Sequence, residues 1–170
     1  MSTQLESRTQ ACVSTAWIIL INKPFYPLYV WALIGAHAAL LSCATLLLAP
    51  LYFVVPYLAH GTEWRARLAL PLVGLGDTIY ATKMIGPAAG TELFLLPCAL
   101  LAIVGFSARE AFTCRVLVVV LYLVYAALHG RYGGPLQDWA PDELARLFSL
   151  NGFAVASLVA FIGLRFARVG

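Results

Sequence analysis

The chain of 170 residues is too apolar for an ordinary soluble domain. Hydrophobic residues make up 62% of it and charged residues 11%, whereas soluble domains average roughly 45–50% apolar and 25% charged residues. The composition predicts an all-α integral membrane protein, and at about 20 residues per span it leaves room for four to six spans but not for a separate catalytic domain. The net charge of +3 forms no continuous basic face, so we expect no nucleic-acid partner.

Residues 1–26 are predicted to form a cytoplasmic or interfacial N-terminal arm. The apolar stretch at 11–21 resembles the hydrophobic part of a signal peptide, but no small-x-small cleavage site follows it. We expect an uncleaved helix with Trp17 and Lys23 at the level of the lipid headgroups. Residues 27–170 are then a single transmembrane helical-bundle domain in contact with the lipid bilayer.

The first long apolar run, at about 27–59, raises the question of where the chain turns. As one helix it would reach about 50 Å at 1.5 Å per residue, against a hydrocarbon core of about 30 Å. Pro50 and Pro56 each remove a backbone donor. The run therefore forms either one tilted, kinked helix, which gives five spans, or a hairpin that turns near Ala49-Pro50, which gives six.

The order of charges along the chain favours six spans over five. The linkers at 60–67 and 107–115 and the C-terminus are basic, and they alternate with acidic segments at 86–92 and 130–146. Under the positive-inside rule this order predicts that both termini are cytoplasmic, which requires an even number of spans. The predicted spans are 27–48, 51–62, 66–85, 90–107, 112–130 and 146–166.

The longest outer loop, at 129–148, is predicted to contain a short amphipathic helix. Ala140-Pro141-Asp142-Glu143 places a proline and two carboxylates at a helix start, where the helix dipole favours negative charge. We expect this helix to lie on the outer surface before the last span.

Asp77 is the strongest functional signal because it lies in the middle of a predicted span. An ionised carboxylate at the bilayer centre costs roughly 2.5–3.5 kcal/mol, and an interhelical hydrogen bond supplies on average only about 0.6 kcal/mol. Asp77 should therefore be neutral, face a wet cavity or pair with a cation. Lys83, six residues further along, lies on a different helix face and is a poor partner. Asp77 is either a ligand, proton or ion site or a structural hydrogen-bonding group.

Four other polar residues join Asp77 as candidate ligand-binding groups. Tyr80 lies in the same predicted span. His37, among small residues of the first span, is either packed in the bundle or lines a pocket. Asn151, beside Gly152 in the last span, is either structural or part of a pocket. Glu92 begins the fourth span, where the helix N-terminus stabilises a carboxylate.

Known catalytic and metal-binding patterns are absent from the sequence. It contains no G-x-S-x-G, no H-E-x-x-H and no phosphate loop. A bis-histidine haem would need a second histidine at the depth of His37, and both His60 and His129 lie at span ends. We predict that the protein is not an enzyme, with no catalytic residues, no metal and no cofactor.

The segment 85–96, IGPAAGTELFLL, resembles the glycine-based signature at the outer turn between spans three and four of six-helix membrane-associated sensor (MASE-type) domains. The similarity extends over 27–166, through Asp77, the turn at 107–110 and Asn151. Those domains precede class III adenylate cyclases, diguanylate cyclases and related bacterial signalling enzymes. The resemblance implies a sensor bundle, here without an output domain, that acts through a protein partner or a homo-oligomer.

Three functions are consistent with these patterns. The leading one is a sensory or ligand-binding bundle of the cell inner (plasma) membrane, which holds a small apolar or amphipathic ligand near Asp77 and takes part in signal transduction. The alternative is a structural or accessory subunit of a larger membrane complex. The third is a small proton-coupled carrier with Asp77 as the coupling site.

Overall fold

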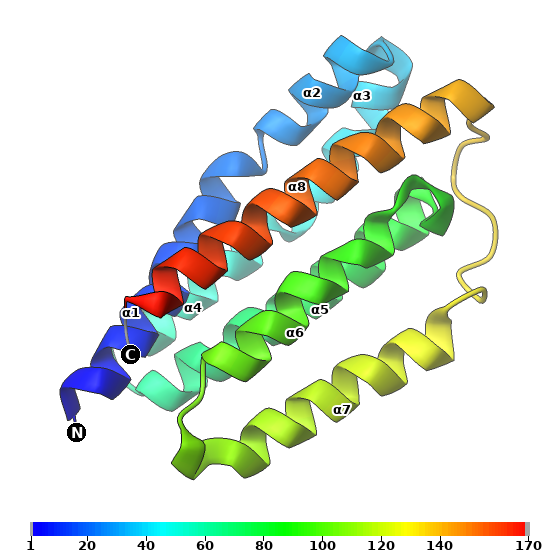
Figure 1. Ribbon diagram of the computed structural model, residues 1–170. Helices are drawn as coiled ribbons and strands as arrows, with labels where there is room; N and C mark the ends of the chain where they lie inside the picture. The colour runs from blue at the N-terminus through cyan, green and yellow to red at the C-terminus, as the bar shows by residue number, and fades with distance from the viewer. Residues whose placement is uncertain (1, 169–170) are drawn as a thin grey trace.

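The computed structural model describes residues 2–168, with side chains from residue 6 onward. Helices that run side by side along one long axis make up nearly all of this part, and it contains no strand (Figure 1). The prediction of an all-α fold is confirmed. The protein is therefore a helical bundle.

The N-terminal segment forms a helix that is packed into the bundle. α1 (Ser2–Asn22) and α2 (Phe25–Leu33) run in the same direction (Figure 1). Ala11, Cys12 and Ala16 of α1 are buried in a core shared with later helices. The predicted boundary between arm and bundle, at 26/27, falls inside α2.

The chain turns at Gly35 and then returns along the bundle. The φ of Gly35 is 136°, a conformation that side chains other than glycine rarely adopt. α3 (Ala36–Cys43), the 3₁₀ helix η1 (Ala44–Phe53) and α4 (Val54–Ala59) follow. Together they form one apolar helical segment. The predicted hairpin near Ala49-Pro50 is wrong, because Pro50 is accommodated inside η1.

The glycine-rich turn lies between the next two helices. α5 (Glu63–Ile85) leads through the 3₁₀ helices η2 (Pro87–Ala89) and η3 (Thr91–Phe94) to α6 (Leu95–Val104). Gly90 has a φ of 77°, and a Cβ atom there would lie 2.9 Å from Phe148 Cδ2. Any other residue at position 90 would adopt a strained backbone conformation and would displace the Phe148 ring of the last helix.

The last two long helices differ in how much of their surface the bundle covers. The 3₁₀ helix η4 (Ala108–Glu110) leads into α7 (Ala111–Leu128), which packs mainly against α6. α8 (Pro141–Ala167) packs against α6, α1, η2 and η3. The predicted separate helix in the loop before the last span is wrong, since α8 begins at Pro141 and continues without a break.

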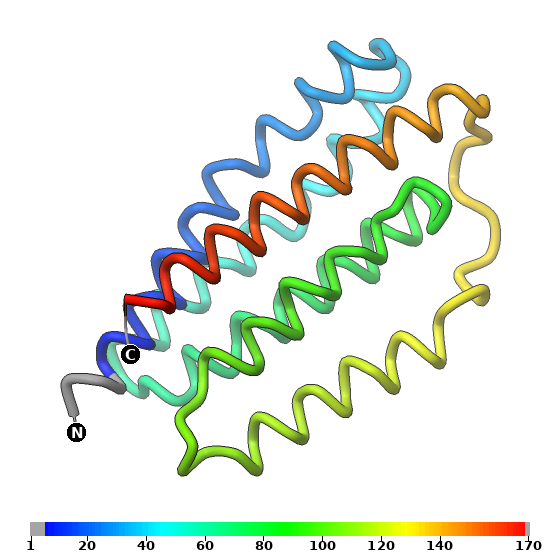
Figure 2. Tube along the Cα trace, viewed as in Figure 1, coloured from blue at the N-terminus to red at the C-terminus, as the bar shows by residue number. Residues whose placement is uncertain are grey.

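Both chain ends lie at one end of the bundle, which we call the terminal end; the opposite end is the far end (Figures 1 and 2). Three segments of the described chain are long and apolar enough to cross a membrane: Ala36–Ala59, Ala108–Leu128 and Pro141–Ala167. This finding is compatible with a membrane protein.

The basic residues are concentrated at the terminal end. Those on helix ends and turns there are Arg8, Arg65, Arg67, Arg109, Arg115, Arg165 and Arg168. The far end carries Lys83, Arg131 and Arg146. Lys23, predicted at headgroup level, lies between the two groups, at the junction of α1 and α2.

Candidate functional site

An ion pair between Asp77 and Lys23 lies in the middle of the bundle. Lys23 Nζ is 2.6 Å from Asp77 Oδ1, and the Tyr52 hydroxyl donates to Asp77 Oδ2 over 3.0 Å. Lys23 Nζ also donates to the Thr45 carbonyl oxygen over 2.8 Å. The cluster therefore joins α5, the α1–α2 junction and η1.

The break between α1 and α2 positions the lysine. α1 ends at Asn22, and Pro24 has no backbone N–H with which to continue the hydrogen-bond ladder. The chain resumes in α2, where the Tyr26 N–H donates to the Lys23 carbonyl oxygen over 3.1 Å. Lys23 therefore sits at the interruption, with its ammonium group turned toward α5.

The ion pair with Lys23 explains how a carboxylate is accommodated in the middle of α5. The Lys23 and Asp77 side chains are only 11% and 16% exposed, and both carboxylate oxygens have a donor. Of the three expected states, the structure shows the one with a charged partner. That partner is a lysine from the segment predicted as an arm. Lys83 instead donates to the Tyr132 carbonyl oxygen over 2.7 Å, at the far end.

Asn151 fastens α8 to the glycine-rich turn. Its Nδ2 donates to the Ala89 carbonyl oxygen over 2.8 Å, and the residue is 1% exposed. Asn151 Oδ1 and the hydroxyl of Tyr26 are both buried, and the two side chains are neighbours. The observed contact fits the structural role that the sequence left open for Asn151.

Glu92 and His37 belong to two histidine–carboxylate pairs at the far end. Glu92 Oε2 is 2.9 Å from His129 Nδ1, which links η3 to the end of α7. His37 Nε2 is 3.1 Å from Glu143 Oε1, which links α3 to the start of α8. Both histidine side chains are more than half exposed. These pairs connect far-end segments, but their exposure to water limits what they add to stability.

The five predicted ligand-binding residues lie at different places. Asp77 is in mid-bundle, His37 and Glu92 are at the far end, and Asn151 is buried beside Ala89. Tyr80 is half-buried on α5. None of the five lines the far-end cleft or the terminal cleft described below.

The far-end cleft lies between α2 and α8 and has a volume of 440 Å³. Its lining is mostly apolar: Leu33, Ala145, Arg146, Ser149, Leu150 and Phe153. At this cleft Arg146 Nη1 donates to the Leu33 carbonyl oxygen over 2.7 Å. A small apolar or amphipathic molecule entering here would contact the two helices at the point where this hydrogen bond joins them.

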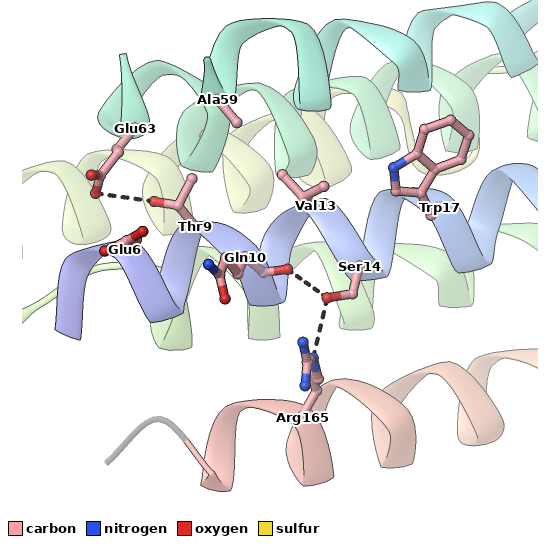
Figure 3. A pocket seen from close by; sticks show the side chains of 9 residues that line it. All are labelled: Glu6, Thr9, Gln10, Val13, Ser14, Trp17, Ala59, Glu63 and Arg165. Carbon is pink, nitrogen blue, oxygen red and sulfur yellow. Dashed lines mark hydrogen bonds between the residues drawn. The ribbon is translucent and has the colours of Figure 1, made fainter. Parts of the chain in front are cut away.

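The terminal cleft, at the opposite end, has a volume of 520 Å³ (Figure 3). Residues of α1, α4, α5 and α8 line it: Glu6, Thr9, Gln10, Val13, Ser14, Trp17, Ala59, Glu63 and Arg165. The Thr9 hydroxyl donates to Glu63 Oε2 over 3.4 Å, and Arg165 Nε donates to Ser14 Oγ over 3.1 Å. The cleft combines acidic, basic and apolar groups, and sequence reasoning did not find it.

A second buried ion pair, also missed in the sequence, holds the α6–α7 turn against α5. Arg67 is 2% exposed and forms two hydrogen bonds of 2.7 Å to the Glu110 carboxylate. It also donates to the Gly105 carbonyl oxygen over 3.1 Å. The spacing Ser107-x-x-Glu110 is a capping-box pattern that would have located the carboxylate. Arg67 belongs to the predicted basic linker at 60–67, and no local pattern marks it as buried.

The described residues contain no group of three or more His, Cys, Asp or Glu side chains that is able to hold a metal ion. Comparisons with family models, curated proteins and solved structures find no match to this chain. The resemblance to MASE-type sensor domains therefore rests on the sequence alone.

Proposed function

We propose that this chain is a sensory helical bundle of the cell inner membrane, which passes a signal to a protein partner or a second copy at its terminal end. The observation that carries the proposal is the Asp77–Lys23 ion pair in mid-bundle. Replacing a buried ion pair by apolar residues often leaves stability unchanged or raises it, and the best-attested use of such pairs is to select one register or state. The Asp77–Lys23 pair and its neighbours join α5, the α1–α2 junction and η1. It is therefore suited to selecting one arrangement of these segments.

α8 offers a mechanical route between the two ends. It is a continuous helix of 27 residues, about 40 Å long at 1.5 Å per residue. At the far end its Arg146 donates to the Leu33 carbonyl oxygen, and at the terminal end its Arg165 donates to Ser14 of α1. A displacement of its far end therefore reaches the end where both termini lie.

The mechanism is a shift between two helix arrangements. A ligand can shift such an equilibrium only by as much as it binds one state more tightly than the other. A small apolar or amphipathic molecule in the far-end cleft would favour the state in which α8 and α2 are separated. The basic residues of the terminal end support a cytoplasmic position for that end under the positive-inside rule. An output partner there would respond to the position of α8.

A distance measurement between spin labels tests the proposal. Arg65→Cys and Arg168→Cys, in a background without the four native cysteines, place one label on α5 and one at the C-cap of α8, both at the terminal end. In nanodiscs we expect one dominant distance between the two labels in the protein that retains Asp77. Asp77→Asn should add a second population, because it removes the charge that holds Lys23. An unchanged single distance would contradict the sensory role.

A structural or accessory subunit remains the second candidate, because one observation favours it. α7 packs mainly against α6, and its outward side chains are strongly exposed, with Phe112 at 80% and Tyr122 at 68%. Acyl chains of lipids or a partner subunit would cover this face, and aromatic side chains are enriched in contacts between subunits. Native purification that recovers a stoichiometric protein partner, together with an unchanged label distance in Asp77→Asn, would favour this candidate over the sensor. No observation favours the proton-coupled carrier.

A further inference from the structure

One face of α1 forms the floor of the terminal cleft. The residues that α1 contributes recur at helical spacing from Glu6 to Trp17, and the walls come from Glu63 on one side and Arg165 on the other (Figure 3). The volume of 520 Å³ falls within the roughly 300–1,000 Å³ that is typical of small-molecule sites. The cleft is large enough to hold a charged headgroup.

The charges in the cleft are arranged by sign. Glu6 and Glu63 lie at one end, whereas Arg165 lies further along α1, beside Ser14 (Figure 3). The level of Ser14 is five residues beyond Thr9, the donor to Glu63, or about 7.5 Å along the helix. A ligand that spans the cleft therefore meets carboxylates at one end and a guanidinium group at the other.

These charged groups still have unused hydrogen-bonding capacity. Arg165 uses Nε toward Ser14, and its two terminal nitrogens have no partner among the described residues. The Glu6 carboxylate likewise has none in this part of the chain, and Glu63 accepts one long bond from Thr9. An arginine fork binds phosphate oxygens, and carboxylates accept from an ammonium group.

The apolar part of the lining lies toward the middle of the bundle. Trp17 is 41% exposed and contacts the Phe53 ring edge-on, with ring centroids 5.5 Å apart. Ile18 and Ile21, the next turn of α1, are 44% and 60% exposed. Tryptophan is enriched at the boundary between headgroups and hydrocarbon. The cleft thus passes from charged groups to exposed apolar surface, the same order of polarity as in a phospholipid.

We infer that the terminal cleft binds a zwitterionic phospholipid whose headgroup carries a primary amine, with the phosphate at Arg165 and the ammonium group between Glu6 and Glu63. A ligand with only negative charge would meet two carboxylates, and one with only positive charge would meet Arg165. A trimethylated amine has no N–H to donate. The acyl chains follow the exposed surface beside Trp17.

This inference goes beyond the sensory role and does not rest on it; it requires only that the chain lies in a bilayer. The full-length chain, stripped of lipid in detergent, is mixed with phosphatidylethanolamine, phosphatidylcholine or phosphatidylglycerol of identical acyl chains. Native mass spectrometry then measures the bound fraction of each. We expect phosphatidylethanolamine to bind about tenfold more tightly than the other two, the effect of one charge-assisted contact. Equal binding of the three lipids would overturn the inference.

Single substitutions test whether Arg165 binds the phosphate and Glu63 the ammonium group of the lipid. Arg165→Gln should weaken phosphatidylethanolamine and phosphatidylglycerol by about tenfold each, whereas Glu63→Gln should weaken phosphatidylethanolamine alone. Arg168→Gln on the same helix and Asp138→Asn in the exposed far-end loop change the net charge equally and should have no effect. If the controls weaken binding as much as the cleft variants do, the selectivity is a matter of net charge and the inference fails.

Two further measurements cover a variant that fails to fold and a soluble ligand in place of a lipid. If Arg165→Gln does not fold, Arg165→Lys retains the charge but loses the fork, and it should still weaken binding measurably. Soluble phosphoethanolamine is titrated against bound lipid, and we expect it to displace little. Displacement at the affinity of the lipid would identify a soluble ligand and refute the lipid source, and a co-purifying protein that blocks all lipid binding would refute it as well.

Discussion

The two buried ion pairs of this bundle use similar chemistry in different settings. Asp77 in mid-bundle accepts from two donors, Lys23 and Tyr52. Glu110 at the terminal end accepts two bonds from Arg67 and two more from the backbone and hydroxyl of Ser107. A carboxylate at a turn can be held by its own neighbours in sequence, whereas one inside a long helix depends on residues from distant segments.

Removal of one member of the mid-bundle pair should have the largest effect on stability. Asp77→Leu leaves an uncompensated ammonium group in the bundle and should cost about 3–5 kcal/mol in the free energy of unfolding. Lys23→Leu should cost a similar amount. The double variant should recover most of the loss, because two apolar side chains need no partner. Unfolding by SDS titration in detergent measures all four proteins. Additive losses in the double variant would show that the two charges do not interact.

The terminal-end pair should respond asymmetrically. Arg67→Met removes a side chain that is 2% exposed and leaves Glu110, which is 20% exposed, with its two bonds from Ser107. We expect a loss of about 2–4 kcal/mol. Glu110→Gln keeps a polar acceptor near Arg67 and leaves the guanidinium bonded to Gly105, so its loss should be smaller. The same SDS titration compares the two variants. A greater loss in Glu110→Gln would show that the buried Arg67 depends on Glu110 more than Glu110 depends on Arg67.

The supporting hydroxyl groups give a finer comparison of the two carboxylates. Tyr52→Phe removes the hydroxyl group that donates to Asp77 and should cost about 1.5–3 kcal/mol, the range for a hydrogen bond to a charged group. Ser107→Ala removes one of four donors to Glu110 and should cost about 0.5–1.5 kcal/mol. Each loss is measured by unfolding, beside Tyr122→Phe, an exposed tyrosine on α7, as a control. Equal losses at the two sites would mean that the number of donors does not set the dependence.

Sequence patterns located features that depend on near neighbours. The all-α class follows from composition, and the glycine turn at 86–90 follows from residues that must adopt positive φ. The partner of Asp77 could not be found in this way, because Lys23 lies 54 residues away and the cation nearest in sequence is Lys83 on the same helix. The false hairpin at Pro50 has a related cause. Length and proline content indicated a turn near residue 50, whereas the chain turns at Gly35, inside the predicted first span.

The exposed far-end pair between His37 and Glu143 should contribute least of the three. The imidazole is 54% exposed, so water competes with the carboxylate and screens any charge that the ring carries. His37→Gln should therefore change the free energy of unfolding by about 0–1 kcal/mol, well below the loss from either buried pair. Glu143 also accepts from the Ala140 N–H at the start of α8 over 2.9 Å, so Glu143→Gln tests the helix start separately. If His37→Gln were as damaging as Asp77→Leu, the far-end contact of α3 with α8, rather than the mid-bundle pair, would hold the bundle in its present arrangement.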